Sequence, residues 1–141
     1  MIYAVIDTNV WVSALLTQNK KAATYRVFTL VFERTITPLY NDGILAEYEE
    51  VLSRKKFSFT REKIDRVLSF IREHGIDTER TPFPDSMPDE DDRVFYEVSL
   101  SQEDSFLVTG NLKHYPVMPH VVTPAEFMKI IEEEQSFIIK T

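Results

Sequence analysis

The sequence predicts an α/β fold, namely a three-layer α/β/α sandwich around a mostly parallel sheet of roughly five strands. Two observations predict it: short apolar runs alternate with segments of helical periodicity, and the first run is apolar throughout. The chain has 141 residues and 43% hydrophobic side chains, which suffices for one core and argues against a second. We therefore expect one domain over residues 1–134, followed by a C-terminal tail over residues 135–141.

Five short segments are expected to form the sheet. The first covers residues 2–6, and its continuous apolar character is typical of a strand buried on both faces. The second covers residues 35–37, and we expect Pro38 to end it because proline cannot donate to a strand ladder. The other three expected strands cover residues 76–78, 105–108 and 120–122.

The segments between the strands carry helical periodicity and capping residues. Asn41 and Thr60 supply side chains that cap helices, and Gly75 is expected to end the second of these. Thr123-Pro124-Ala125-Glu126 combines a capping box with proline at the first helical position. The expected helices cover residues 10–16, 20–32, 42–53, 61–74, 92–101 and 124–134, and residues 81–88, with three prolines, form a loop.

Composition restricts the classes of function. The chain contains no cysteine, which excludes a disulfide framework, a thiolate zinc site and a cysteine nucleophile. The formal net charge is −7, which argues against tight binding to nucleic acid because phosphate affinity comes from lysine and arginine. The N-terminus has no basic flank, and no apolar run approaches the roughly 20 residues that span a bilayer. We expect a cytoplasmic protein without a membrane partner.

Polar side chains stand where two predicted strands end. Asp7 directly follows the first strand, and Asn111 follows the fourth strand by way of Thr109-Gly110. In open parallel sheets, ligands bind at the carboxyl ends of the strands. Glu47 lies one turn past a capped helix start, and three aspartates precede the fourth strand at positions 89, 91 and 92.

Carboxylates gathered from separate segments repel one another unless a cation neutralises them. Mg²⁺ and Mn²⁺ prefer oxygen ligands of this kind. Such a site suits phosphodiester hydrolysis, in which the metal ion activates water and stabilises charge on the phosphate. Each acid also has a structural interpretation on its own: Asp7 as turn chemistry, Glu47 as a solvated helical residue, and Asp89 with Asp92 as a helix cap.

Five short motifs occur in a fixed order along the chain. They are Ile6–Val10, Ile44–Tyr48, Asp89–Phe95, Phe106–Asn111 and Val122–Phe127. This ordered set, over about residues 1–133, resembles the PIN-domain family, a metal-dependent ribonuclease fold common among the toxins of toxin–antitoxin pairs.

The resemblance implies that Asp7, Glu47 and Asp92 bind Mg²⁺ or Mn²⁺, with Asp7 as the central ligand. By the same resemblance Asp92 is preferred to Asp91, because it lies seven residues before Ser99, at the small-residue stretch of the following helix, as the family's acid does. The other residues expected at the site are Asn111 as a catalytic residue, and Asn9, Thr109 and Asp89 in support.

One departure from the family pattern concerns the segment after the fourth strand. Many PIN domains have a fourth aspartate there, whereas this chain has Asn111, which offers a neutral oxygen. His114 is a candidate substitute, although we interpret it first as a histidine of a surface loop. This departure makes the number of metal ions, and activity itself, open questions.

The resemblance implies an endoribonuclease, the toxin component of a toxin–antitoxin pair, with an antitoxin and a second copy of the chain as candidate partners. Two alternatives remain: a degenerate PIN module that binds RNA or protein without cleavage, and a phosphatase of the haloacid-dehalogenase kind. The second lacks the expected aspartate two residues after Asp7, where Asn9 stands. Candidate RNA contacts are Lys20, Lys21, Arg54, Lys55, Lys56 and Arg93. The apolar residues 137–139 are expected to dock on the protein's own core.

Overall fold

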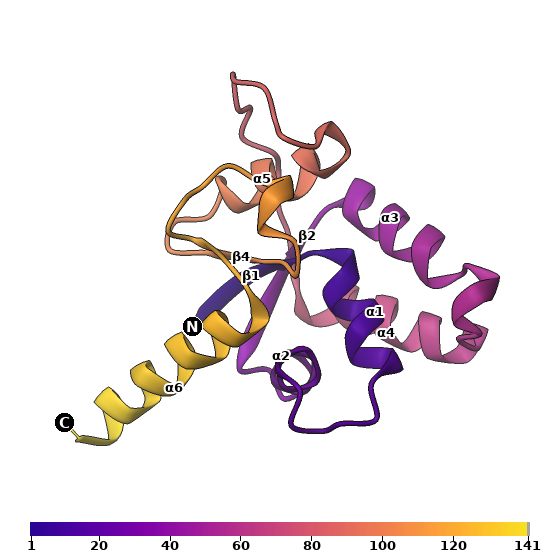
Figure 1. The fold of residues 1–141 in the computed structure, drawn as a ribbon, viewed down its shortest axis with the longest axis horizontal. Helices are drawn as coiled ribbons and strands as arrows, with labels where there is room; N and C mark the ends of the chain where they lie inside the picture. Colours follow the sequence, from indigo (N-terminus) through magenta and orange to yellow (C-terminus); the bar gives the residue numbers. More distant parts are fainter. Residues whose placement is uncertain (141) are drawn as a thin grey trace.

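Five parallel strands form the central sheet of the protein (Figure 1). The structure is a computed structural model that describes the backbone of residues 1–140 and the side chains of residues 1–135. The strand order is β3-β2-β1-β4-β5. The strands are β1 (Ile2–Ile6), β2 (Ile36–Tyr40), β3 (Ile76–Asp77), β4 (Phe106–Val108) and β5 (Val121–Val122). The prediction of an α/β fold with a parallel five-stranded sheet is confirmed.

Helices pack on both faces of this sheet. In Figure 1, α5 lies above the strands, against β1 and β4, whereas α1, α2 and α6 lie below them. The helices are α1 (Thr8–Leu16), α2 (Ala23–Phe32), α3 (Asp42–Leu52), α4 (Arg61–His74), α5 (Arg93–Ser99) and α6 (Pro124–Lys140). Three short 3₁₀ turns connect them, namely η1 (Lys55–Phe57), η2 (Glu90–Asp92) and η3 (Leu112–His114). Within the described part of the chain, no helix has the length and apolar character that a bilayer crossing requires.

The topology places a switch point between β1 and β4. The chain moves from β1 to β2 and then β3 in one direction, and returns through α5 to β4 on the other side of β1. Ligands of such sheets bind in the crevice at the carboxyl ends of the strands beside this reversal. The backbone N–H of Asp7 donates to the carbonyl oxygen of Val108 at 2.9 Å, so the ends of β1 and β4 are held together there.

The expectation that Pro38 ends the second strand was wrong. β2 runs through Pro38 to Tyr40, and Pro38 pairs in register with Ala4 of β1. The carbonyl oxygen of Pro38 faces Gly75, on the side of the strand where β3 lies. The backbone nitrogen and oxygen of one strand residue point to the same side, so the nitrogen of Pro38 also faces β3 and not β1. Pairing of β2 with β3 begins only at Leu39, so the missing N–H of Pro38 removes no ladder bond.

Several helix boundaries also differ from expectation. α6 continues to Lys140 instead of ending near Glu134, because no glycine or proline interrupts it. The expected helix over residues 92–101 is the shorter α5, which covers Arg93–Ser99, and Asp92 belongs to the preceding 3₁₀ turn η2. The predicted docking of residues 137–139 concerns side chains outside the described part of the structure.

The predicted caps form as side-chain hydrogen bonds. The Asn41 side chain accepts from the backbone N–H of Ile44, and Thr60 accepts from that of Lys63. At α6 the capping box is reciprocal: Glu126 N–H donates to Thr123 Oγ1 at 3.1 Å, and Thr123 N–H donates to Glu126 Oε1 at 3.0 Å. These caps fix the starts of three helices.

The hydrophobic core lies on both faces of β1. Its largest fully buried side chains include Trp11, Tyr48, Phe95 and Phe127, from four different helices. Trp11 and Tyr48 meet edge to face with ring centroids 6.1 Å apart. The core therefore joins α1 and α3 at the switch-point end of the sheet.

We expect Gly75→Ala to destabilise the protein by about 1–3 kcal/mol, the usual cost of overpacking. A Cβ atom at position 75 would lie 2.6 Å from the carbonyl oxygens of Ile71 and Pro38, which are backbone atoms and cannot move aside. Gly110→Ala is the control, because a Cβ there meets nothing within 4 Å. Urea unfolding of both variants measures the difference, and equal stabilities would contradict this account of the contact between α4 and β2.

Candidate metal centre

Asp7 lies at the switch point, directly after β1 and before the first turn of α1. Its side chain is buried, with 4% of the residue exposed. Thr109 Oγ1 donates to Asp7 Oδ2 at 2.7 Å, and the Tyr115 hydroxyl donates to the same oxygen at 3.1 Å. Thr109, directly after β4, thus orients the carboxylate of Asp7, directly after β1. This contact is expected because β1 and β4 are neighbouring parallel strands.

Glu47 lies in the second turn of α3, a position fixed by the Asn41 cap. The neighbouring Tyr48 hydroxyl donates to the carbonyl oxygen of Ile6, which fastens α3 to the end of β1. Glu47 Oε2 accepts from Thr8 Oγ1. Burial raises the pKa of Glu47, the Thr8 hydrogen bond lowers it, and the negative charge of Asp7 raises it further. Both burial and the charge of Asp7 therefore favour the protonated form of Glu47.

Asp92 ends the 3₁₀ turn η2 and is buried, whereas its neighbour Asp91 is exposed. Its Oδ2 atom lies 2.8 Å from Nδ1 of His114. Burial raises the pKa of Asp92 to about 6, and the charge of Asp7 contributes in the same direction. Of the two adjacent aspartates, the buried one is the one that the sequence resemblance favours.

A histidine joins this acid cluster. His114 Nδ1 lies 3.6 Å from Asp89 Oδ2 as well as beside Asp92, and its Nε2 lies 2.8 Å from the side-chain amide of Asn111. The interpretation of His114 as a histidine of a surface loop was therefore incomplete, because its ring faces the carboxylates. Asp89 also accepts from the backbone N–H of Asp91 at 3.0 Å, so it stabilises η2 besides facing His114.

The predicted residues converge on one edge of the sheet but do not all meet. Among the described residues, one trio has ligand atoms within 4.8 Å of one another, namely Asp89, Asp92 and His114. Asp7 and Glu47 lie outside this trio, and the carboxylate of each accepts a hydrogen bond from a hydroxyl donor. Asn9 is exposed in the first turn of α1.

Two contributors to the site were not expected from the sequence. Thr8 and Tyr115 hold the carboxylates of Glu47 and Asp7. His114, the candidate substitute for the fourth aspartate, contacts Asp92. Thr8 lies between two expected site residues, Asp7 and Asn9, so the sequence could have indicated that it belongs to the site. Tyr115 lies in a loop without periodicity, so only the fold shows that its hydroxyl reaches β1.

The six candidate RNA contacts have differing surroundings. Arg93 is held by Glu90 and by the backbone oxygens of Phe83 and Asp85, which indicates a structural role for its guanidinium. Arg54 pairs with Glu50 one helical turn earlier. The four lysines, at positions 20, 21, 55 and 56, are exposed. RNA contact by these residues stays a prediction.

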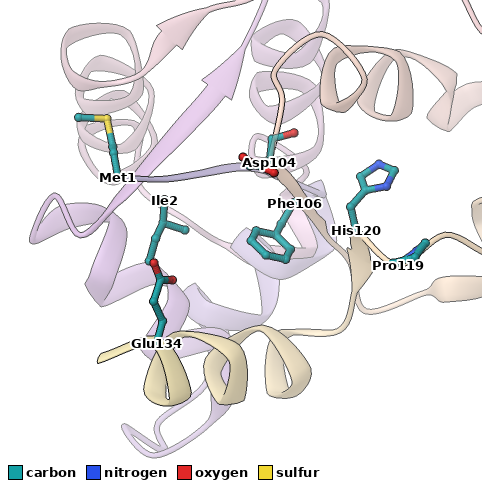
Figure 2. Close-up of a pocket in the computed structure, with 8 residues that line it drawn as sticks. Met1, Ile2, Asp104, Phe106, Pro119, His120 and Glu134 are labelled. Atoms are coloured by element: carbon teal, nitrogen blue, oxygen red, sulfur yellow. The ribbon is translucent and has the colours of Figure 1, made fainter. Parts of the chain in front are cut away.

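A cavity of about 490 Å³ lies at the opposite edge of the sheet (Figure 2). Its lining residues come from the amino ends of β1 and β4, from the loop before β5 and from α6; they include Ile2, Asp104, Phe106, His120 and Glu134. None of the residues in the acid cluster lines it. The cavity therefore has no part in the candidate metal centre.

The metal-free protein is expected to lose stability as pH rises from about 4 to about 7, through the Asp92 carboxyl. Its pKa is raised in the folded state to about 6 from 3.8, so its favourable contribution is complete below pH 3.8 and is lost as pH rises through 6. The loss amounts to at most about 3 kcal/mol.

Urea unfolding of wild type and Asp92→Asn in EDTA, at pH 4.5 and 7.5, measures this effect. The variant is expected to gain stability relative to wild type at the higher pH. Burial lowers the pKa of His120, so this histidine makes the folded protein more stable as pH rises. Its contribution is the same in both proteins and cancels when their stabilities are compared. A stability difference that is the same at both pH values would contradict the assignment.

The comparison with family models agrees with this geometry. A family model described as a PIN domain matches residues 3–113, which span β1 to η3 and include Asp7, Glu47, Asp92 and Asn111. The comparisons with curated proteins and with solved structures gave no match. The family generally consists of metal-dependent nucleases. Since the match covers most of the chain, the protein belongs to the PIN-domain family.

Proposed function

We propose that the protein is a divalent-metal-dependent endoribonuclease. One observation carries the proposal: Asp7, Glu47 and Asp92 come from three separate segments, and the pKa values of Glu47 and Asp92 are raised through burial and the charge of Asp7. Carboxylate pKa values that are raised by burial, and further by a neighbouring charge, are typical of functional sites. The PIN-domain family supplies the reaction class.

The residues present fit a hard divalent cation. Asp7, Glu47 and Asp92 offer carboxylate oxygens, the ligands that Mg²⁺ and Mn²⁺ prefer. When bound, such an ion supplies charge stabilisation on the phosphate and an activated water nucleophile. Asp7 is proposed as the central ligand, because it is the acid whose charge acts on both of the others.

The protein's own groups prepare the site for this cation. Thr109 and Tyr115 fix the rotamer of Asp7, and Thr8 does the same for Glu47. These hydroxyl donors hold carboxylates that repel one another at the same edge of the sheet. Outer-shell hydrogen bonds of this kind orient ligating carboxylates and tune the bound metal ion.

RNA is the proposed substrate, although the net charge of −7 predicts weak and salt-sensitive binding. The exposed residues Lys20, Lys21, Lys55 and Lys56 are the candidates to hold the phosphate backbone outside the acid cluster. An acidic catalytic crevice also suits inhibition by a partner that inserts basic residues. This supports the proposed role as a toxin controlled by an antitoxin, and we propose the cytoplasm as its location.

A second candidate function rests on Asn111. It stands where many PIN domains carry a fourth aspartate, and its amide contacts His114 at 2.8 Å. A chain lacking that carboxylate could bind RNA or a protein partner without cleavage. Calorimetry distinguishes the two functions, because a folded protein that binds no Mn²⁺ would favour the non-catalytic module.

Cleavage of a fluorescent single-stranded RNA pool tests the proposal. Wild type is expected to produce fragments with Mn²⁺ or Mg²⁺ and none with EDTA, and the activity should return when the ion is restored. A DNA pool of the same sequences is the matched substrate control. RNA cleavage that is unaffected by EDTA would contradict the metal-dependent mechanism.

A further inference from the structure

We propose that His114 is a nitrogen ligand of the metal centre, which, with Asp89 and Asp92, makes the site favour a transition-metal ion over Mg²⁺. This inference rests on the proposed function and specifies the cation that the site accepts. The family match ends at residue 113, directly before this histidine. The proposal therefore comes from the contacts of this chain.

The first argument is the arrangement of the three ligand atoms. His114 Nδ1 lies 2.8 Å from Asp92 Oδ2 and 3.6 Å from Asp89 Oδ2, and all three atoms lie within 4.8 Å of one another. Adjacent ligands that bind one ion at about 2.1 Å lie roughly 3 Å apart. Small side-chain rotations therefore suffice for the three atoms to close on a common ion.

The second argument is the partner of the other ring nitrogen. The Nδ2 atom of the Asn111 side-chain amide lies 2.8 Å from Nε2 of His114. A metal-binding imidazole almost always donates its second N–H to an outer-shell acceptor, which fixes its tautomer and orientation. Rotation of the Asn111 amide by half a turn about its Cβ–Cγ bond places its oxygen beside Nε2. The Nε2–H group can then donate to this oxygen, while Nδ1 keeps its lone pair for the ion.

The third argument is access. The side chains of His114 and Asp89 are each 37% exposed, whereas that of Asp92 is 12% exposed. The trio therefore has one buried carboxylate and two ligands that face solvent, which leaves an entry path for a hydrated ion. Asp92 also belongs to the proposed set with Asp7 and Glu47, so the nitrogen ligand extends that centre.

The fourth argument is ligand chemistry. Imidazole nitrogen favours first-row transition metals, whereas Mg²⁺ takes oxygen ligands and retains its waters. The other two histidines face different partners: His120 Nε2 contacts Ser99 Oγ at 3.0 Å, and His74 Nε2 contacts Arg34 at 3.1 Å. They therefore serve as controls for a spectroscopic signal from an imidazole nitrogen bound to the metal ion.

The test uses Mn²⁺ and Mg²⁺ as probes on the full chain, without RNA. Pulsed electron paramagnetic resonance of the Mn²⁺-loaded protein is expected to show coupling to an imidazole ¹⁴N nucleus. His114→Gln should abolish that coupling and weaken Mn²⁺ binding by about tenfold or more in calorimetry, with a much smaller change for Mg²⁺. His74→Ala is the matched control and should retain both the coupling and the Mn²⁺ affinity.

Two outcomes would overturn the inference: Mn²⁺ bound without nitrogen coupling in wild type, or coupling that persists in His114→Gln. Equal losses of Mn²⁺ and Mg²⁺ affinity in that variant would also overturn the proposed metal preference. Failure of the proposed function is distinguishable, because it would show as nitrogen-coupled Mn²⁺ in a protein that cleaves no RNA. Circular dichroism of each variant confirms that it is folded.

Discussion

Asp7→Asn is expected to reduce metal-dependent RNA cleavage by at least about a hundredfold. Outer-shell partners of metal ligands already contribute about ten- to a hundredfold, so removing the central ligand should cost more. Asparagine keeps the shape of the side chain and an oxygen that accepts from Thr109 and Tyr115. The fold should therefore survive, and the loss should reflect the missing negative charge.

The measurement is the initial cleavage rate of the RNA pool at saturating Mn²⁺, with thermal unfolding as the control for folding. Asp104→Asn is the matched variant. Asp104 is an exposed aspartate with φ 62°, a backbone conformation that asparagine also tolerates, and it lies at the opposite edge of the sheet. Cleavage at the wild-type rate by Asp7→Asn would exclude Asp7 as a metal ligand.

Glu47→Gln is expected to have the second-largest effect, again a loss of about a hundredfold or more in cleavage. Glutamine can still accept from Thr8, so α3 should stay in place while the carboxylate charge disappears. Burial and the neighbouring charge of Asp7 raise the pKa of Glu47, so the metal-free variant should be at least as stable as wild type.

Glu49→Gln, two residues further along α3, is the control for Glu47→Gln. Glu49 pairs with Arg61 on the surface, and its loss should leave the cleavage rate within about twofold, since exposed ion pairs contribute little. If both variants cleave RNA at the wild-type rate, Glu47 is a solvated helical residue and the proposed ligand set is wrong.

Much of the fold could be predicted because local signals and tertiary packing agree. The apolar run of β1 is a buried central strand, and the caps at Asn41, Thr60 and Thr123 start helices as predicted. Pro38 shows where local reasoning fails. Whether a proline breaks a strand depends on the neighbour that its nitrogen faces, and β3 does not reach that point.

The part of the candidate site that lies at the ends of strands could be predicted from the sequence. Asp7 and Thr109 follow adjacent parallel strands, so their hydrogen bond follows from the topology. The contact of His114 with Asp92 depends on how the 3₁₀ turn η3 folds back over η2, which no periodicity encodes. The sequence therefore indicated the acids and left the role of the imidazole open.

The net charge of −7 is consistent with nuclease function because of where the acids lie. Asp7, Glu47 and Asp92 are proposed to bind a cation, which would offset part of their charge. The remaining excess predicts weak RNA affinity, so recognition would depend on the metal ion and a few exposed lysines.

The central claim is that Asp7, Glu47 and Asp92, which gather at the edge of the sheet where β1 and β4 end, bind a divalent cation. Anomalous diffraction from a crystal soaked in Mn²⁺ tests it most directly. We predict a Mn²⁺ peak within about 2.0–2.6 Å of carboxylate oxygens of both Asp7, the proposed central ligand, and Asp92. The absence of Mn²⁺ from this edge of the sheet, at concentrations that support RNA cleavage, would contradict the claim.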